Sequence, residues 1–210
     1  METEILTNTI ETSNHLRHFR EVGQLNKWML KAIWPYLRGR KMEMGSGSGG
    51  FSSLLVENGI TVHLNDIENK YREVLRRKFS GVSLVRSMHK IDFHHNEFEK
   101  IYSNLFETID TVLSLNIVDH NPIDSQAIIN AKRLLRKNGN FIILTPIYTA
   151  LYDEIDQDLE DLAKYNWSSI TKLLGKDLTI IETNYINIDP TMATTILSHK
   201  GLSVIVVASK

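Results

Sequence analysis

The chain of 210 residues has no cysteine, only four prolines and almost no net charge. Without cysteine there is no disulfide, no thiolate zinc site and no cysteine nucleophile. A formal net charge of -1 gives no overall attraction to nucleic acid or to an anionic membrane. No apolar run reaches the length that a membrane-spanning helix requires. These absences point to an ordinary globular protein.

Two of these features bear on the compartment in which the protein works. The lack of cysteine agrees with a reducing environment. The first residues, Met1-Glu2-Thr3-Glu4, are polar and acidic, unlike a secretory signal. We therefore expect a cytoplasmic protein. Because 42% of its residues are hydrophobic, the chain can bury the core of one domain.

Apolar spacing predicts a helical N-terminal extension over residues 1–40. Its apolar stripe recurs every three or four positions until Pro35 and Gly39 interrupt it. The stripe consists of Leu25, Trp28, Met29, Ala32 and Ile33. It either packs on the core or folds over a pocket as a lid. Residues 41–210 form the main part of what we expect to be a single domain.

Strand and helix patterns alternate along residues 41–210, which predicts an α/β protein. Strands are expected at 41–44, 60–65, 82–88, 109–115, 141–144, 178–185 and 202–208. Helices are expected from the glycine turn to about residue 58, and over 69–79, 124–136 and 148–174, with Asn138-Gly139-Asn140 capping the third. The last two strands lack a long crossover, so they should pair antiparallel. The fold expected is a Rossmann-like, seven-stranded, mostly parallel sheet with helices on both faces and a C-terminal antiparallel hairpin.

The segment Lys41–Gly50 joins an apolar run to a helix pattern through a glycine-rich turn. Glycines allow a sharp turn and a close approach to a ligand, because they have no Cβ. The helix start adds free N–H groups and a positive dipole end, so such turns cradle nucleotides or nucleosides. Gly45, Gly47 and Gly50 fit the dinucleotide pattern G-x-G-x-x-G. Another assignment uses Gly49 in place of Gly50, and a surface turn without a ligand is a third interpretation.

The assignment through Gly49 depends on the acid before the turn. Glu43, Gly45, Gly47 and Gly49 form acid-x-G-x-G-x-G, which resembles motif I of the class I S-adenosylmethionine-dependent methyltransferases. The resemblance implies that the turn, with Ser46, binds S-adenosylmethionine. It also implies that Glu43 helps to hold the cationic, amino-acid end of this cofactor. Dinucleotide folds usually keep an apolar residue there, so Glu43 favours the methyltransferase.

A second acid follows the second predicted strand. Asp66 lies seventeen positions after Gly49 (66 − 49 = 17), at a strand end where open α/β sheets bind ligands. A carboxylate there can accept both ribose hydroxyls, because two cis donors match its two oxygens. Asp66 also precedes a helix, and a helix N-cap role is compatible with ribose binding. We predict that Asp66 binds the ribose and that the adjacent Ile67 lies against the cofactor.

The resemblance extends to the ends of the third and fourth strands. These methyltransferases often place an acidic-apolar pair near the end of the third strand. The acid takes the adenine amino group and the apolar residue packs on the base. Asp92 and Phe93 are the candidates, and Ser87 is a rival position for the acid. After the fourth strand, the resemblance implies that Asn116 faces the cofactor.

The segments Leu115–His120 and Ala150–Asp156 resemble parts of one subgroup of these methyltransferases. The resemblance places His120 near the substrate, where its pKa range suits a general base; support of a loop is the alternative. Tyr152, in the second segment, is the other catalytic candidate. Metal-using relatives carry glutamate at the position of Asn116, so we expect no metal. The arginine-containing run that follows in those relatives is absent here, which leaves the substrate open.

The sequence therefore predicts an enzyme that transfers a methyl group from S-adenosylmethionine to an oxygen or nitrogen atom of a small molecule. The alternatives are a non-catalytic, methyltransferase-like binding or regulatory module, an RNA methyltransferase using the basic residues between Lys70 and Lys78, and an NAD(P)-dependent reductase. The charge balance argues against nucleic acid as a partner. No membrane partner is expected, and a homodimer is compatible with the sequence.

Overall fold

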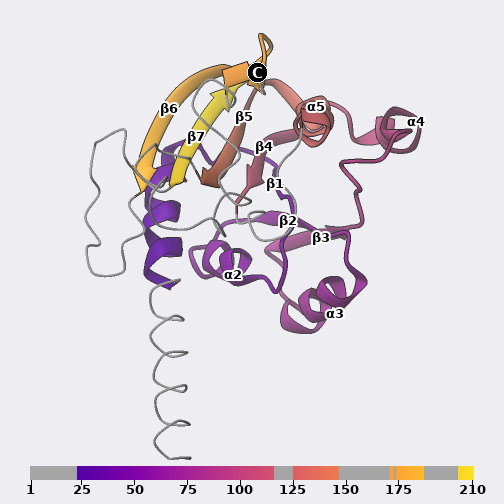
Figure 1. Ribbon diagram of the computed structural model, residues 1–210. Coiled ribbons are helices and arrows are strands. Elements are labelled where there is room, and N and C mark those ends of the chain that lie inside the picture. Colours follow the sequence, from indigo (N-terminus) through magenta and orange to yellow (C-terminus); the bar gives the residue numbers. More distant parts are fainter. Residues whose placement is uncertain (1–22, 116–124, 147–170, 173, 187–202) are drawn as a thin grey trace, which may run out of the picture.

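Seven strands form a single sheet in the part of the chain that the structure describes. The computed structural model describes residues 23–115, 125–146, 171–172, 174–186 and 203–210. The strand order is β3-β2-β1-β4-β5-β7-β6 (Figure 1). The strands are β1 (Lys41–Glu43), β2 (Val62–Asn65), β3 (Val85–His89), β4 (Ile109–Ser114), β5 (Leu135–Pro146), β6 (Thr179–Ile186) and β7 (Ser203–Ser209).

Helices precede or connect most of these strands. Residues 23–33 are helical and lead into the short 3-10 helix η1 (Trp34–Tyr36). The others are α2 (Gly50–Glu57), α3 (Asn69–Lys78), α4 (Phe98–Tyr102), the 3-10 helix η2 (Ser103–Leu105) and α5 (Ser125–Leu134). No helix in these described segments is both long and apolar enough to cross a membrane.

The pairing of the strands confirms the predicted fold. β1 pairs parallel with β2 and β4, and the parallel pairs continue to β3 and β5. β7 pairs antiparallel with both β5 and β6, as the short connection between the last strands predicts. The strand order reverses between β1 and β4, so their carboxyl ends flank the place where an open α/β sheet binds its ligand.

The two faces of the sheet bury separate hydrophobic clusters. One cluster joins the sheet to residues 23–33, α2 and α3, and the other joins it to α4 and α5. Figure 1 shows α2 and α3 away from α5, with the strands between them. Helices therefore cover both faces, and the edge formed by the carboxyl ends of the strands is left for binding.

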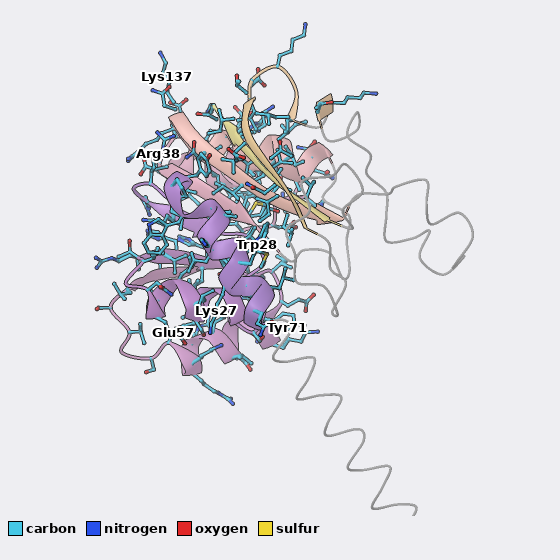
Figure 2. The ribbon with its side chains drawn as sticks, turned by 90° about the vertical axis from the view of Figure 1, so that its left-hand side faces the viewer. Lys27, Trp28, Arg38, Glu57, Tyr71 and Lys137 are labelled. Carbon is cyan, nitrogen blue, oxygen red and sulfur yellow. The ribbon has the colours of Figure 1, made fainter. Side chains whose placement is uncertain are left out.

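The helical segment 23–33 packs on the α2 side of the sheet. Met29, Leu30 and Ile33 of the predicted stripe are buried there. Lys27 and Glu57 line a groove between this segment and α2, on the side seen in Figure 2. The role of residues 1–40 as a lid stays a prediction, because residues 1–22 lie outside the described part of the chain.

The structure corrects the sequence-based assignment around residues 135–140. The predicted helix 124–136 ends at Leu134, and Asn138-Gly139-Asn140 belongs to strand β5 instead of a helix cap. The backbone of Asn138 and Gly139 bonds to the chain end: Asn138 N donates to Lys210 O at 2.8 Å and Lys210 N to Gly139 O at 3.0 Å. Pairing with a distant segment therefore outweighs the local helix-ending pattern. The short helices α4 and η2 were not predicted, although Phe98, Tyr102 and Leu105 recur at helical spacing and pack on the core.

Candidate functional site

The glycine turn follows β1 at the point where the strand order reverses. Three of its residues have a positive φ: Gly45 (61°), Gly47 (54°) and Gly49 (75°). A side chain would strain each of these conformations, which explains the alternating glycines. The turn is closed by Gly49 N donating to Ser46 O at 2.8 Å, and Ser46 N donates to Asn65 O at 2.8 Å. The turn is thus tied to the end of β2.

Two glycines of the turn have opposite surroundings. A Cβ at Gly49 would lie 2.8 Å from Leu75 Cδ2 and 2.8 Å from Phe79 Cε2, so this glycine lets α3 pack against the turn. A Cβ at Gly47 would meet no atom within 4 Å. Gly47 therefore faces open space, and its backbone is accessible to a ligand.

Asp66 lies at the end of β2 and contacts the glycine turn directly. Its Oδ2 accepts a hydrogen bond from Gly47 N at 2.8 Å, and its Oδ1 accepts one from Glu68 N at 2.9 Å. Each carboxylate oxygen can accept a second hydrogen bond, so two ribose hydroxyls find acceptors here. Glu68, and not Asp66, is the N-cap of α3. Asp66 thus joins the two loops that were predicted to bind cofactor.

Glu43 is buried beneath the turn, with 2% of its surface exposed. Ser52 Oγ of α2 donates a hydrogen bond to Glu43 Oε2, and Ser46 Oγ donates to the backbone oxygen of Glu43 at 3.4 Å. Burial raises the pKa of the Glu43 carboxyl to about 7, although the Ser52 hydroxyl acts in the opposite direction. Close to neutral pH this carboxyl is therefore partly protonated.

The loop after β3 is held by Asn65, an asparagine that was not among the predicted site residues. Asn65 Oδ1 accepts from Ile91 N at 2.6 Å, and Asn65 Nδ2 donates to Ile91 O at 3.2 Å. The next residue, Asp92, accepts a hydrogen bond from His94 N at 2.9 Å through Oδ1. Phe93 is buried and stacks on Phe98 with ring centroids 5.8 Å apart. An asparagine at a strand end is a weak signal, because many such residues only cap turns.

Other predicted residues fall into three groups. Ile67 follows Asp66 and is 47% exposed. Ser87, the rival to Asp92, bonds to two histidines: its Oγ lies 2.6 Å from His63 Nδ1 and 2.5 Å from His89 Nε2. Asn116, His120 and Tyr152 lie outside the described residues.

No three histidine, aspartate or glutamate side chains come together as a metal site within the residues that the structure describes. The absence of a metal from this protein stays a prediction.

Two basic residues of α3 contact the predicted cofactor loops, although from the sequence they looked like part of a charged helix surface. Arg72 is buried and donates to the backbone oxygens of Asp66 and Ile67 at 2.9 and 2.5 Å. Lys78 Nζ donates to Gly49 O at 2.8 Å. The only available signal was the spacing, which places both on the face of α3 that carries Leu75.

A sheet of this order, with a glycine turn and a carboxylate at its switch point, defines a Rossmann-like protein that binds a nucleoside cofactor. The family described as "Methyltransferase domain" matches residues 42–143. This span contains the glycine turn, Asp66 and the loop after β3. The family match, together with the fold, supports the class I S-adenosylmethionine-dependent methyltransferase superfamily, an enzymatic function and S-adenosylmethionine as the cofactor.

Solved structures of low sequence identity share the fold. A SAM-dependent methyltransferase from Archaeoglobus fulgidus is 20% identical, with a TM-score of 0.61 over 90% of this chain and 94% of that protein. A Thermotoga maritima protein, described as a SAM-dependent methyltransferase and possible histamine N-methyltransferase, is 17% identical, with a TM-score of 0.64 over 97% and 95%. A SAM-dependent methyltransferase from Methanosarcina mazei is 15% identical, with a TM-score of 0.61 over 85% and 96%. No curated protein matches this chain.

The described residues suit this cofactor. The open space at Gly47 leaves room for a ligand against the turn, and Asp66 keeps acceptor capacity beside it. Two carboxyl groups border the turn, Asp66 and the buried Glu43, which suits a cofactor with a cationic end.

Proposed function

We propose that this enzyme transfers a methyl group to an oxygen or nitrogen atom of a small molecule. The observation that supports the cofactor half of the proposal is the 2.8 Å hydrogen bond from Gly47 N to Asp66 Oδ2. It brings the turn and the acid into one cradle across two strands.

Each residue of the cradle has a proposed role. Asp66 accepts the two ribose hydroxyls, and the backbone at Gly47 borders the amino-acid end of the cofactor. Asp92 takes the adenine amino group, and Phe93 packs near the base. When bound, S-adenosylmethionine supplies an electrophilic methyl group on a sulfonium. The protein then has to align the acceptor atom, exclude water and remove a proton where the acceptor carries one.

His120 and Tyr152 are the proposed catalytic residues on the acceptor side. A histidine suits proton removal because its ordinary pKa lies close to neutral pH. Asn116 is proposed to face the cofactor from the end of β4. Replacing His120 by Ala should lower kcat while the dissociation constant of S-adenosylhomocysteine stays unchanged. A loss of cofactor binding in this variant would contradict the catalytic role.

A small acceptor fits the charges of the protein better than RNA does. The formal net charge is -1, and two of the five basic residues between Lys70 and Lys78 point their charges into the cofactor loops. Only the other three of these basic residues then remain to bind the phosphate backbone of an RNA. The Thermotoga maritima relative is described as a possible histamine N-methyltransferase, which is consistent with a small acceptor. Cytoplasmic location and a homodimer stay predictions.

Calorimetric titration with S-adenosylhomocysteine tests the central proposal. Asp66→Ala should raise the dissociation constant by about 100-fold, because two hydrogen bonds to a charged acceptor are lost. Asp177→Ala is the matched control, since Asp177 is exposed before β6 and its carboxylate pairs with Lys132 of α5. An unchanged dissociation constant for Asp66→Ala would refute the ribose role. A screen of small amines and phenols for methyl transfer then tests the acceptor class, and transfer to RNA alone would contradict it.

A further inference from the structure

One face of α3 contacts both loops of the cofactor cradle. Arg72, Leu75, Lys78 and Phe79 are spaced by three, three and one residues, so they lie on one side of the helix. Leu75 and Phe79 are buried against Gly49, where an added Cβ would lie 2.8 Å from each. The two basic residues flank this apolar contact: Arg72 lies on the side of the Asp66 loop, and Lys78 lies on the side of the glycine turn.

Arg72 fixes the backbone that carries Asp66. Its Nη1 donates to Asp66 O at 2.9 Å and to Ile67 O at 2.5 Å, and its Nη2 donates to Asn69 Oδ1 at 3.1 Å. Its side chain forms no ion pair among the described residues, and only 7% of the residue is exposed. A buried guanidinium is costly unless its donors are used, and here carbonyl and amide oxygens use them. The charge thus serves to hold the loop.

Lys78 makes the corresponding contact with the glycine turn. Its Nζ donates to Gly49 O at 2.8 Å and to Ser48 O at 3.2 Å. Both carbonyls belong to the glycine turn, and Gly49 O also accepts hydrogen bonds from Ser53 N at 3.1 Å and Ser53 Oγ at 2.8 Å, at the start of α2. A direct bond from Gly47 N to Asp66 Oδ2 at 2.8 Å joins the two loops on the ligand side. The loops are therefore fixed to each other on one side and to α3 on the other.

We propose that Arg72 and Lys78 are positioning residues that hold the ribose-binding acid and the glycine turn at the separation the cofactor requires. The inference rests on S-adenosylmethionine as the cofactor of this cradle. It assigns the buried Arg72 and the exposed Lys78 of α3 to the cofactor site. Arg76 and Arg77 are exposed, as Lys78 is, but unlike Lys78 they form no side-chain hydrogen bond to either loop among the described residues.

The proposal predicts different effects for the two ends of the cofactor. Arg72 acts through Asp66, which binds the ribose, and Lys78 acts through the turn, which borders the amino-acid end. Arg72→Met should weaken S-adenosylhomocysteine and 5′-methylthioadenosine by the same factor, since both contain the ribose. Lys78→Met should weaken S-adenosylhomocysteine more than 5′-methylthioadenosine, because the latter lacks the amino-acid end. A general loss of folding would weaken both compounds in both variants.

The experiment is calorimetric titration of both compounds, with Arg76→Met and Arg77→Met as matched controls on the same helix. We expect the dissociation constant of S-adenosylhomocysteine to rise about 10-fold or more for Arg72→Met and Lys78→Met, and to stay within about twofold for the controls. Lys78→Arg should restore most of the affinity, because it keeps a donor near the two carbonyls. Wild-type affinity in Arg72→Met and Lys78→Met would overturn the proposal.

A double-mutant cycle shows whether Arg72 acts through Asp66. If it does, Asp66→Ala with Arg72→Met should bind no more weakly than Asp66→Ala alone. Fully additive losses would contradict this route. If Arg72→Met does not fold, the same titrations are made with Arg72→Lys and Lys78→Met. Thermal unfolding of each variant without ligand shows whether it is folded. A wild-type protein that ignores S-adenosylhomocysteine would instead refute the cofactor, which separates the two failures.

Discussion

The buried acid Glu43 shows how a single residue can link the cofactor turn to pH. Its carboxyl is enclosed by the start of α2 and accepts a hydrogen bond from Ser52. Burial penalises the charged form, so the pKa of Glu43 rises to about 7. The sequence motif identified the acid, but its burial and its serine partner depend on how α2 packs. The role of Glu43 in holding the amino-acid end of the cofactor stays a prediction.

Replacing Glu43 by Gln should stabilise the protein at alkaline pH. The folded-state pKa lies above the unfolded value, so the native state binds more protons between about pH 4.5 and pH 7. Stability from this group is complete below that range and is lost as the pH rises through 7. Glu43→Gln should therefore raise the free energy of unfolding at pH 8 by about 1–3 kcal/mol and change it little at pH 4.5. Urea unfolding at both values measures this.

Glu57→Gln is the control for that measurement, because Glu57 is an exposed glutamate at the end of α2, the helix whose Ser52 bonds to Glu43. As a substitution at an exposed position, it should change the free energy of unfolding by less than about 0.5 kcal/mol at either pH. A Glu43→Gln variant with the same unfolding free energy as the wild-type protein at every pH would show that the carboxyl is not perturbed.

The two alanine substitutions in the glycine turn should separate stability from binding. Gly49→Ala forces a Cβ against Leu75 and Phe79 at φ 75°, so it should lower the free energy of unfolding by about 2–4 kcal/mol. Gly47→Ala meets open space and should cost only about 1–2 kcal/mol, from its positive φ. It should nevertheless weaken S-adenosylhomocysteine more than it weakens the fold. Urea unfolding and calorimetric titration of both variants test this, and equal losses of stability would contradict it.

Strands β2 and β3 carry a chain of hydrogen bonds whose direction is set by an arginine. Arg40 Nε donates to His63 Nε2 at 3.1 Å, so the proton of His63 lies on Nδ1 and points toward Ser87 Oγ, 2.6 Å away. The Ser87 hydroxyl can then donate to His89 Nε2 at 2.5 Å. Both imidazoles are thus neutral in this arrangement. Burial is the main cause of a His63 pKa lowered to about 4, and it also lowers the pKa of His89.

The protein should lose part of its stability when this chain is acidified. The groups facing His63 are Arg40, His89, Arg86 and Lys41, all of which disfavour its protonation. A folded-state pKa below the unfolded value gives stability that is present above pH 6.5 and is lost as the pH falls toward 4. After allowance for the partial exposure of His63, the loss is about 1 kcal/mol.

The His63→Gln variant isolates this contribution, because Glu43 has the opposite pH dependence between pH 4.5 and pH 7. The difference in unfolding free energy between wild type and His63→Gln should shrink by about 1 kcal/mol from pH 7 to pH 4. Urea unfolding at four pH values measures it. A difference that is constant with pH would show that His63 titrates normally.

At the scale of elements, the sequence predicted what depends on local pattern and missed what depends on pairing. The seven strands and the antiparallel hairpin were predicted because alternation and connection length determine them. Asn138-Gly139 resembled a helix end, because asparagine and glycine tolerate the positive φ that ends many helices. Asn138 does have a positive φ, of 63°, but within strand β5. The backbone partner that makes this segment a strand is Lys210, at the other end of the sequence. No local pattern reports such a partner.

In the whole molecule, the predicted part of the site is again the part that depends on local sequence pattern. Motif and spacing predicted Gly47 and Asp66 as one site, and the structure places their backbone and carboxylate 2.8 Å apart. Asn65 and Arg72 were missed, because an asparagine at a strand end and an arginine on a helix are each usually solvent-facing. Only the packing of α3 turns Arg72 inward. A basic helix surface therefore cannot be interpreted as an RNA site until its side-chain directions are known.

The whole protein should be stabilised by the product of its cofactor. A ligand that binds only the native state, present at about 100 times its dissociation constant, raises the free energy of unfolding by about 2.7 kcal/mol. For a chain of this length that corresponds to an increase in Tm of about 5–10 °C. S-adenosylhomocysteine should give this increase in a thermal unfolding scan, and NADH at the same concentration should give none. Asp66→Ala should lose the increase, because the ribose hydroxyls lose their acceptor. Stabilisation by NADH alone would show that the turn acts through Gly45, Gly47 and Gly50 as a dinucleotide site, and the methyl-transfer proposal would then fall with its cofactor.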